Sequence, residues 1–312
     1  MKLTYEQIAS VTSGAVNHTV TEEGISFFKC TEKQIDAWTK RVPVLGERAM
    51  CSTGIRLDFH TDSGSFGFEN TAGDKFDLYI NGVITDRIRP GVPGSYSAAL
   101  PDGDTRVTLI FPSHGKGAVL KSVTLDDGAS FVRHEYSRKI LFVGDSITQG
   151  WNSVFDSLSY AWRTVLHYDA DCVMNAIGGA VFYPEANDSI DFDPDTVIVS
   201  LGTNDYDVCK TQDELKDAAD GVFSFLEKEY AGARLVAITP IWRADEDKPR
   251  KVGTFSDVCD IVANSAAGHG FEVLRGYGFV PHITKLYADA VLHPNDLGFE
   301  FYADSLIKAL GD

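Results

Sequence analysis

A serine in the middle of the chain stands where it could act as a nucleophile. The apolar run Ile140–Val143 ends abruptly in Gly144-Asp145-Ser146. Such a run is typical of a strand buried on both faces of a parallel sheet, and the carboxyl ends of these strands form the edge where doubly wound sheets bind ligands. A serine at that edge, just before a helix, exposes its hydroxyl where developing negative charge is favoured. Ser146 is therefore the candidate nucleophile, and the alternative is that it merely caps a helix.

Three further turns carry the other groups that acyl transfer needs, which are a base and donors for the oxyanion. They are Asn175–Gly179, Gly202-Thr203-Asn204-Asp205 and, near the chain end, Asp289–Asn295 with His293. Each follows or lies close to an apolar strand-like run, and the carboxyl ends of parallel strands gather at one edge. Taken singly, the glycine pair could just permit a tight turn, Asn204 could be a turn former and His293 a surface residue.

In order and spacing, the four segments resemble the four blocks of the SGNH/GDSL hydrolases. The resemblance covers roughly residues 138 to 312 and implies a serine esterase or lipase with a flavodoxin-like sheet. It implies that Ser146 attacks the ester carbonyl and that His293 acts as general base and then as acid toward the leaving alcohol. The implied oxyanion donors are the backbone N–H groups of Ser146 and Gly179 and the side-chain amide of Asn204, with Gly178 as the alternative backbone donor.

The chain departs from the family pattern at one position. The family has an aspartate three residues before the histidine, where this sequence has Ala290, and the nearest acid is Asp289, four residues before His293. We expect an irregular loop to absorb the extra residue, so that Asp289 still orients His293. The alternative is that a backbone carbonyl orients the imidazole, as happens among family two carbohydrate esterases.

Aromatic and basic residues follow the strand-like run Arg234–Thr239 and could meet the substrate. Trp242 and Arg243 are expected at the rim of the crevice, where the indole could stack on a sugar ring or could equally pack between domains. Tyr206, directly after Asn204-Asp205, is a further candidate for the same wall.

The chain divides into two parts that differ in their pattern of apolar and polar residues. From about residue 20 to residue 130, short alternating runs separated by turn signals such as Asn81-Gly82 predict an all-β domain. Beyond Arg138, apolar strands alternate with amphipathic helices, which predicts a three-layer α/β domain with a mainly parallel sheet. We expect a jelly-roll-like β-sandwich over residues 1–134 and the flavodoxin-like hydrolase domain over residues 135–312. This order of domains resembles the family two carbohydrate esterases, which remove acetyl groups from polysaccharides.

Composition limits the partners. The 28 basic and 45 acidic residues give a formal net charge of -17, which disfavours nucleic acid and anionic membranes. The odd number of scattered cysteines, five, favours reduced thiols, and no apolar leader or bilayer-length run is present, so we predict a cytoplasmic protein. The histidine spacing supports no metal site, and neither a metal nor a cofactor is expected.

These observations predict a serine esterase that removes acetyl or other short acyl groups from a small-molecule or oligosaccharide ester. Two alternatives stay open. An acyl-thioesterase or lysophospholipase of the same fold would need an apolar acyl tunnel, which a Trp-Arg rim does not indicate. A carbohydrate-binding protein that has lost activity is disfavoured, because serine, histidine, glycine and asparagine are retained together. The oligomeric state is left open.

Overall fold

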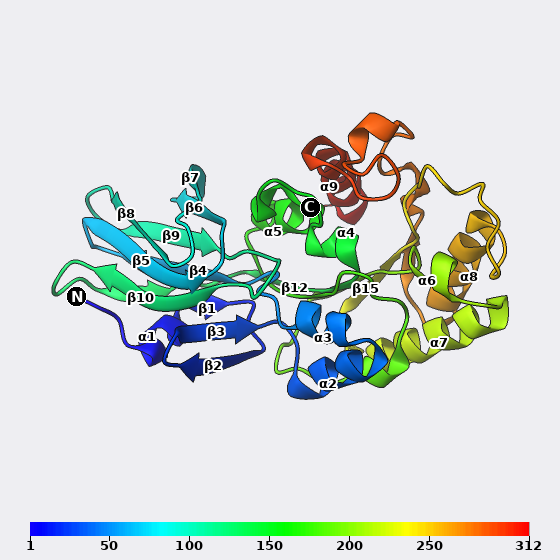
Figure 1. Cartoon of the computed structure of the whole chain (residues 1–312), viewed down its shortest axis with the longest axis horizontal. Helices are drawn as coiled ribbons and strands as arrows, with labels where there is room; N and C mark the ends of the chain where they lie inside the picture. The colour runs from blue at the N-terminus through cyan, green and yellow to red at the C-terminus, as the bar shows by residue number, and fades with distance from the viewer. Residues whose placement is uncertain (312) are drawn as a thin grey trace.

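The computed structural model describes residues 1–311 and contains three β-sheets. Two antiparallel sheets lie at one end of an elongated molecule, and a parallel sheet flanked by helices lies at the other (Figure 1). No helix within the described residues is long and apolar enough to cross a membrane.

The antiparallel sheets form the β-rich N-terminal part that the sequence predicted. Their strands are β1 Thr12–Ser13, β2 Asn17–Thr21, β3 Gly24–Phe28, β4 Arg56–Thr61, β5 Ser65–Ala72, β6 Phe76–Ile80, β7 Val83–Ile88, β8 Gly94–Ala99, β9 Thr105–Ile110, β10 Val119–Leu125 and β11 Phe131–Arg133. One sheet has the order β1-β4-β9-β6-β7 with β11 beside β4, and the other has the order β2-β3-β10-β5-β8. Phenylalanines that alternate along the strands fill the core, among them Phe59, Phe66 and Phe68. The jelly-roll connectivity stays a prediction.

The all-β expectation is wrong between β3 and β4. Besides α1 Tyr5–Ser10, this part of the chain holds α2 Glu32–Arg41 and α3 Pro43–Ala49. A reciprocal capping box between Thr31 and Gln34 begins α2, and Pro43 occupies the first turn of α3. The apolar side chains Trp38 and Leu45 pack into the core of the α/β part rather than into the sandwich. This segment therefore covers a face of the parallel sheet, next to α7 Gln212–Glu229 (Figure 1).

The parallel sheet brings the predicted turns to one edge. Its strands are β12 Arg138–Gly144, β13 Ala170–Ala176, β14 Thr196–Ser200, β15 Arg234–Ile238 and β16 Glu272–Leu274. They run parallel in the order β13-β12-β14-β15-β16, which is the flavodoxin order. Gly144 at the end of β12 is in register with Ala176 and Ser200 on the neighbouring strands. The turns after these three strands consequently start at the same level of the sheet.

Helices on both faces complete the three expected layers. They are α4 Ser146–Gln149, α5 Tyr160–His167, α6 Asp205–Val208, α8 Phe255–Gly268 and α9 Asp296–Leu310, with the 3-10 turns η1 Asp156–Leu158, η2 Pro184–Ala186, η3 Gly276–Gly278 and η4 Thr284–Leu286. The helices α7 and α8 pack on one face of the sheet, and α5 and α9 pack on the other. Asn295 caps α9 by accepting the Gly298 N–H at 3.0 Å.

A buried ion-pair network joins the sandwich to the α/β part. Asp58 on β4 accepts hydrogen bonds from Arg106 at 2.8 Å, Tyr136 at 2.6 Å and Arg56 at 3.1 Å. Arg56 also donates to the carbonyl of Ala170 at the start of β13, at 2.7 Å. Burial alone would raise the pKa of Asp58, but the hydrogen bond from Arg106 and the charges of both arginines lower it to about 2. The boundary between residues 134 and 135 stays a prediction.

Candidate active site

The turn after β12 places Ser146 at the carboxyl edge of the sheet. Asp145 is the N-cap of the short helix α4, and its carboxylate accepts the Ile147 N–H at 2.8 Å. A side chain at Gly144 would put a Cβ 2.1 Å from Thr148 Oγ1, so only glycine fits there. Ser146 is the first residue of α4 and is 4% exposed. Its hydroxyl therefore lies in a nearly enclosed position at a helix N-terminus.

Ser146, His293 and Asp289 form a chain of hydrogen bonds. Ser146 Oγ lies 2.8 Å from His293 Nε2, and His293 Nδ1 lies 2.7 Å from Asp289 Oδ2. An ionised carboxylate can only accept a hydrogen bond, so Nδ1 carries the proton in this pair. Nε2 of the neutral ring then has its lone pair directed at the serine hydroxyl. This is the tautomer that a base acting on Ser146 requires.

The loop before His293 accommodates the extra residue through a left-handed backbone. Ala290 has φ of 59°, which folds the chain so that Asp289 Oδ1 accepts the N–H groups of Val291 at 2.9 Å, Leu292 at 2.8 Å and His293 at 3.1 Å. Partial burial acts to raise the pKa of Asp289, but these N–H groups and the imidazole outweigh it and lower the pKa to about 2. Within the described residues, the partner of Nδ1 is this carboxylate and not a backbone carbonyl.

The glycine pair presents one free backbone donor. The Gly178 N–H donates to Gln149 Oε1 at 2.7 Å, so the alternative oxyanion donor is already occupied. Gly179 adopts φ of 88°, a conformation that favours glycine. In residues 1–311, the N–H groups of Gly179 and Ser146 have no hydrogen-bond partner in the protein. These two donors are thus the ones available to an oxyanion.

Asn204 is held in place by the neighbouring turn. Its Nδ2 donates to the carbonyl of Ala180 at 2.9 Å, which uses one of the two amide hydrogens and leaves the other. The carbonyl of the preceding Thr203 accepts from Arg243 Nη1 at 2.9 Å. The side chain of Asn204 is half-buried and stands directly before α6.

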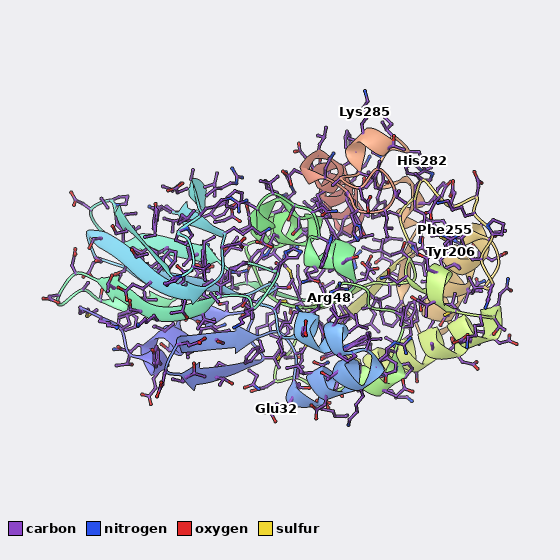
Figure 2. All side chains as sticks on the ribbon, viewed as in Figure 1. Glu32, Arg48, Tyr206, Phe255, His282 and Lys285 are labelled. Carbon is purple, nitrogen blue, oxygen red and sulfur yellow. The ribbon has the colours of Figure 1, made fainter. Side chains whose placement is uncertain are left out.

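Two residues expected at the rim lie inside the protein instead. Arg243 is 3% exposed, and its guanidinium pairs with Asp245 at 2.6 Å and with Asp207 at 3.0 Å. Tyr206 is 1% exposed and packs its ring against Phe255 with a centroid separation of 5.2 Å (Figure 2). Their carboxylate and aromatic partners hold both side chains in the interior, and contact of either with the substrate stays a prediction.

Trp242 belongs to a group of aromatic side chains beside the His293 loop. Its indole N–H donates to Glu246 Oε1 at 3.1 Å. One face of the ring stacks on His282, with centroids 5.2 Å apart, and Tyr287 meets it edge-on at 5.3 Å. The ring is half-buried, and a role as a sugar platform stays a prediction.

Two residues near Ser146 and His293 were not identified as candidates in the sequence. The ring of Trp151 lies 6.3 Å from that of His293, and the guanidinium of Arg48 lies 5.0 Å above the indole. Arg48 Nη1 also donates to the Gly178 carbonyl at 2.7 Å. Trp151 lies two residues beyond the end of α4, and that position was a usable signal. Arg48 gave none, because it lies far upstream in a segment expected to be β.

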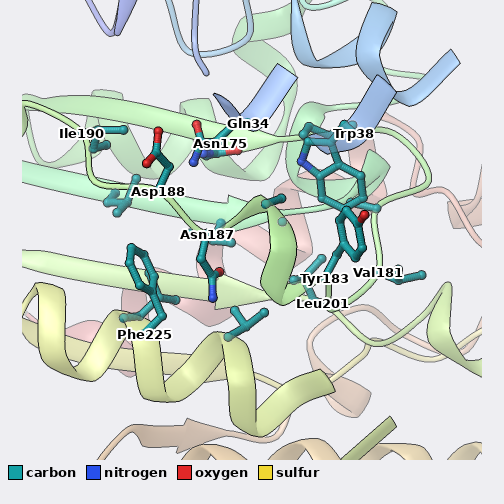
Figure 3. A pocket seen from close by; sticks show the side chains of 18 of the residues that line it. Gln34, Trp38, Asn175, Val181, Tyr183, Asn187, Asp188, Ile190, Leu201 and Phe225 are labelled. Atoms are coloured by element: carbon teal, nitrogen blue, oxygen red, sulfur yellow. The ribbon is translucent and has the colours of Figure 1, made fainter. Parts of the chain in front are cut away.

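A separate cavity of about 50 Å³ lies on the face of the sheet covered by α2 and α7 (Figure 3). Trp38, Tyr183 and Phe225 line its apolar side, and Asn175 and Asp188 line its polar side. Neither Ser146 nor His293 is among its lining residues. Among residues 1–311, no group of three or more His, Cys, Asp and Glu side chains is arranged to hold a metal ion.

Comparison with known proteins gives one family match and many structural ones. A model of the GDSL-like lipase/acylhydrolase family matches residues 142–301. No curated protein sequence matches the chain.

Several solved structures share the fold across both parts of the chain. A salicylyl-acyltransferase, SsfX3, from a tetracycline biosynthetic pathway superimposes with a TM-score of 0.83 and 17% identity, covering 99% of this chain and 96% of that one. The acetyl xylan esterase Est2A from the rumen bacterium Butyrivibrio proteoclasticus gives a TM-score of 0.63 at 17% identity, covering 99% and 98%. A family two carbohydrate esterase with a carbohydrate binding domain from Corynascus thermopiles gives 0.66 at 19% identity, covering 84% and 94%.

Proposed function

Because the chain belongs to the GDSL-like lipase/acylhydrolase family and is an ester hydrolase of the SGNH type, we propose that it removes acetyl and other short acyl groups from a carbohydrate or glycoside through Ser146, His293 and Asp289. The observation that carries this proposal is the hydrogen-bonded chain from Ser146 Oγ to His293, 2.8 Å, and from His293 to Asp289, 2.7 Å. A nucleophile, a base and a group that orients the base are the arrangement that acyl transfer through a serine requires.

The reaction proceeds in two steps. Ser146 Oγ attacks the ester carbonyl carbon while its proton passes to His293 Nε2, and the carbonyl oxygen becomes an oxyanion. The N–H groups of Ser146 and Gly179 and the amide of Asn204 donate to that oxyanion, and each such donor accelerates acyl-transfer enzymes by about 10²- to 10³-fold. The bond to the alcohol breaks as His293 returns the proton to the leaving oxygen. Water, activated by the same imidazole, then hydrolyses the acyl-enzyme.

The enclosure of the nucleophile supports a short acyl group. Ser146 is 4% exposed, and the Trp151 ring lies 6.3 Å from the His293 ring, so an acyl chain enters a confined space. The net charge of -17 disfavours adsorption to anionic lipid surfaces. The carbohydrate part of the proposal is supported by the shared fold with the acetyl xylan esterase and the family two carbohydrate esterase.

The decisive experiment measures hydrolysis by the purified protein. Aryl acetate, butyrate and octanoate come first, followed by acetylated sugars, and kcat/KM is expected to be highest for acetyl esters. Ser146→Ala is expected to abolish turnover with an unchanged melting temperature, because removing one hydroxyl creates no cavity in the core. An organophosphonate should label wild-type Ser146 covalently. Higher kcat/KM on octanoyl esters favours the lysophospholipase or thioesterase alternative, and an inert wild type favours the carbohydrate-binding one.

A second candidate is transfer of the acyl group to an alcohol other than water. The salicylyl-acyltransferase shares the fold over 99% of this chain, with a TM-score of 0.83. An acyl-enzyme on Ser146 could react with either acceptor, and a site that excludes water favours the alcohol. Adding simple alcohols and sugars to the acetate assay separates the two reactions, since a transferase forms a new ester whereas a hydrolase releases acetate.

A further inference from the structure

The turn at Gly178-Gly179, which carries a proposed oxyanion donor and is called the oxyanion turn below, is held by a residue from the N-terminal part of the chain. Arg48, labelled in Figure 2, stands near the end of α3, and its side chain contacts the turn after β13. Its Nη1 donates to the Gly178 carbonyl at 2.7 Å. A Cβ on Gly179 would lie 3.1 Å from the same nitrogen, which places the guanidinium directly against the donor peptide.

This hydrogen bond determines the direction of the Gly179 N–H. The carbonyl of Gly178 and the N–H of Gly179 belong to one planar trans peptide unit, so they point in opposite directions. Because Arg48 holds the carbonyl on one side, the N–H is directed to the other side. Glycine at φ of 88° would otherwise allow this peptide to rotate at little steric cost.

The preceding peptide is held as well. Gln149, at the end of α4, accepts the Gly178 N–H at 2.7 Å and donates to the carbonyl of Ser113 in the sandwich part. Gly178 therefore makes two hydrogen bonds, in which its N–H donates to Gln149 and its carbonyl accepts from Arg48. The N–H of Gly179 is the next donor along the chain, and it has no partner within the described residues.

Arg48 itself is firmly positioned and carries an uncompensated charge. The buried Lys29 donates to the Arg48 carbonyl at 2.8 Å, and the Arg48 guanidinium lies over the Trp151 ring at 5.0 Å. Within residues 1–311, the partners of its guanidinium are the Gly178 carbonyl and the Trp151 ring, and neither carries a negative charge. Arg243, which holds the Thr203 carbonyl in a comparable way, is instead neutralised by Asp207 and Asp245.

We propose that Arg48 is a positioning residue of the oxyanion hole, which directs the Gly179 N–H at the oxyanion and polarises that peptide through its unpaired positive charge. The inference rests on the proposed function, because it assigns the oxyanion to the Gly179 donor. It also makes the α2–α3 segment a part of the hydrolytic site. The effect is on the transition state, since charge develops on the carbonyl oxygen only as Ser146 attacks.

Arg48→Ala and Arg41→Ala form a matched pair for the test. Both arginines lie in the α2–α3 segment and both guanidinium groups stack over aromatic rings, since Arg41 lies 4.5 Å above Tyr183. For Arg48→Ala we expect kcat on an aryl acetate to fall about 10- to 100-fold with KM nearly unchanged, because one oxyanion donor is misdirected rather than removed. Arg41→Ala should keep wild-type kcat. Arg48→Lys, which retains the charge and a donor, should recover part of the loss.

Two further readouts separate positioning from a general structural effect. Guanidinium ion at millimolar concentration should restore part of the kcat of Arg48→Ala and leave that of Arg41→Ala unchanged. The rate of labelling by an organophosphonate should fall in parallel with kcat. Arg48→Met retains packing against Trp151 and carries the same kinetic expectation, so it decides the case in which the alanine variant is unstable.

The inference is overturned if Arg48→Ala or a folded Arg48→Met keeps kcat within about threefold of wild type, or if the loss is confined to KM. A loss that guanidinium does not relieve and that follows the melting temperature also overturns it. Failure of the proposed function looks different, because the wild-type protein itself would then lack Ser146-dependent turnover.

Discussion

Asp289 contacts His293 because Ala290, the residue after Asp289, adopts a left-handed backbone conformation. The carboxylate lies 2.7 Å from Nδ1 although Ala290 lengthens the loop by one residue, and φ of 59° at Ala290 is what allows it. The same carboxylate accepts the N–H of His293 at 3.1 Å, so it fixes the backbone as well as the imidazole. A single side chain thereby sets both the place and the tautomer of the proposed base.

The first prediction concerns this carboxylate. Asp289→Asn should lower kcat by about 10³- to 10⁴-fold with KM nearly unchanged, because the amide favours the wrong tautomer and does not stabilise the imidazolium. Steady-state kinetics on an aryl acetate measure it. A loss smaller than about tenfold would indicate a Ser146–His293 pair that works without the acid.

A second prediction follows from a buried carboxyl group beside the oxyanion turn. Asp205 is fully buried and accepts the Phe182 N–H at 3.1 Å through Oδ1, while Oδ2 has no partner among residues 1–311. Burial raises its pKa to about 7. The native state therefore keeps a proton that the unfolded chain, with a pKa of about 3.9, releases. The stabilisation is complete below about pH 4 and is lost as the pH rises to about 7.

Asp205→Asn removes this titration. We expect the free energy of unfolding of the variant, relative to wild type, to rise by on the order of 2–4 kcal/mol between pH 4 and pH 8. Urea unfolding at several pH values measures the difference. Asp145, whose pKa burial also raises to about 7, titrates in both proteins, and its charge adds to the rise in the pKa of Asp205. Parallel stability curves for the two proteins would contradict the prediction.

A third prediction tests the amide donor. Asn204→Ala should lower kcat by about 10²- to 10³-fold, since an oxyanion donor of this kind acts in the transition state and contributes little to substrate binding. The hydrogen bond to the Ala180 carbonyl is lost as well, so the melting temperature should fall slightly. Asn204→Asp should lower kcat further than Asn204→Ala, because a carboxylate beside the oxyanion repels its negative charge. Wild-type kcat in either variant excludes Asn204 as a donor.

Local sequence patterns were sufficient to predict most of the elements that position the site. The buried run before Gly144 and the turns at Gly178-Gly179 and at Asn204 are set by residues adjacent in the chain. A parallel sheet then brings these turns to one edge whatever the rest of the fold is. For this reason the strands, the layers and the neighbourhood of Ser146 and His293 could be anticipated without coordinates.

Contacts between distant segments could not be anticipated. Trp38 and Leu45 are buried against the α/β part, so helix formation in α2 and α3 depends on a surface that is remote in the sequence. Arg243 follows the end of a strand, where a rim residue is expected. Its side chain is nevertheless buried, and its Nη2 pairs with Asp207 Oδ2 at 3.0 Å. Proximity to the carboxyl edge predicts which side chains gather there and does not predict which way each one faces.

The last prediction compares two tryptophans, one expected from the sequence and one found in the structure. Trp242 has one face covered by His282 and its N–H bound to Glu246, whereas Trp151 lies 6.3 Å from His293 with Arg48 above it. From this proximity to the proposed base we predict that the Trp151 indole contacts the part of the substrate next to the scissile ester. Trp151→Ala should therefore raise KM for acetylated sugars about 10-fold or more, in line with the loss of one stacking contact of about 1.4 kcal/mol.

Trp242→Ala serves as the comparison within the same assay. If the sugar extends toward the His293 loop, this variant should raise KM for acetylated sugars more than for a small aryl acetate. If the sugar is bound by Trp151 alone, Trp242→Ala should change KM less than about twofold and should instead lower the melting temperature, because it removes the packing against His282 and Tyr287. If Trp151→Ala leaves KM for acetylated sugars unchanged and Trp242→Ala raises it strongly, the sugar contacts Trp242, as the sequence predicted, and not Trp151.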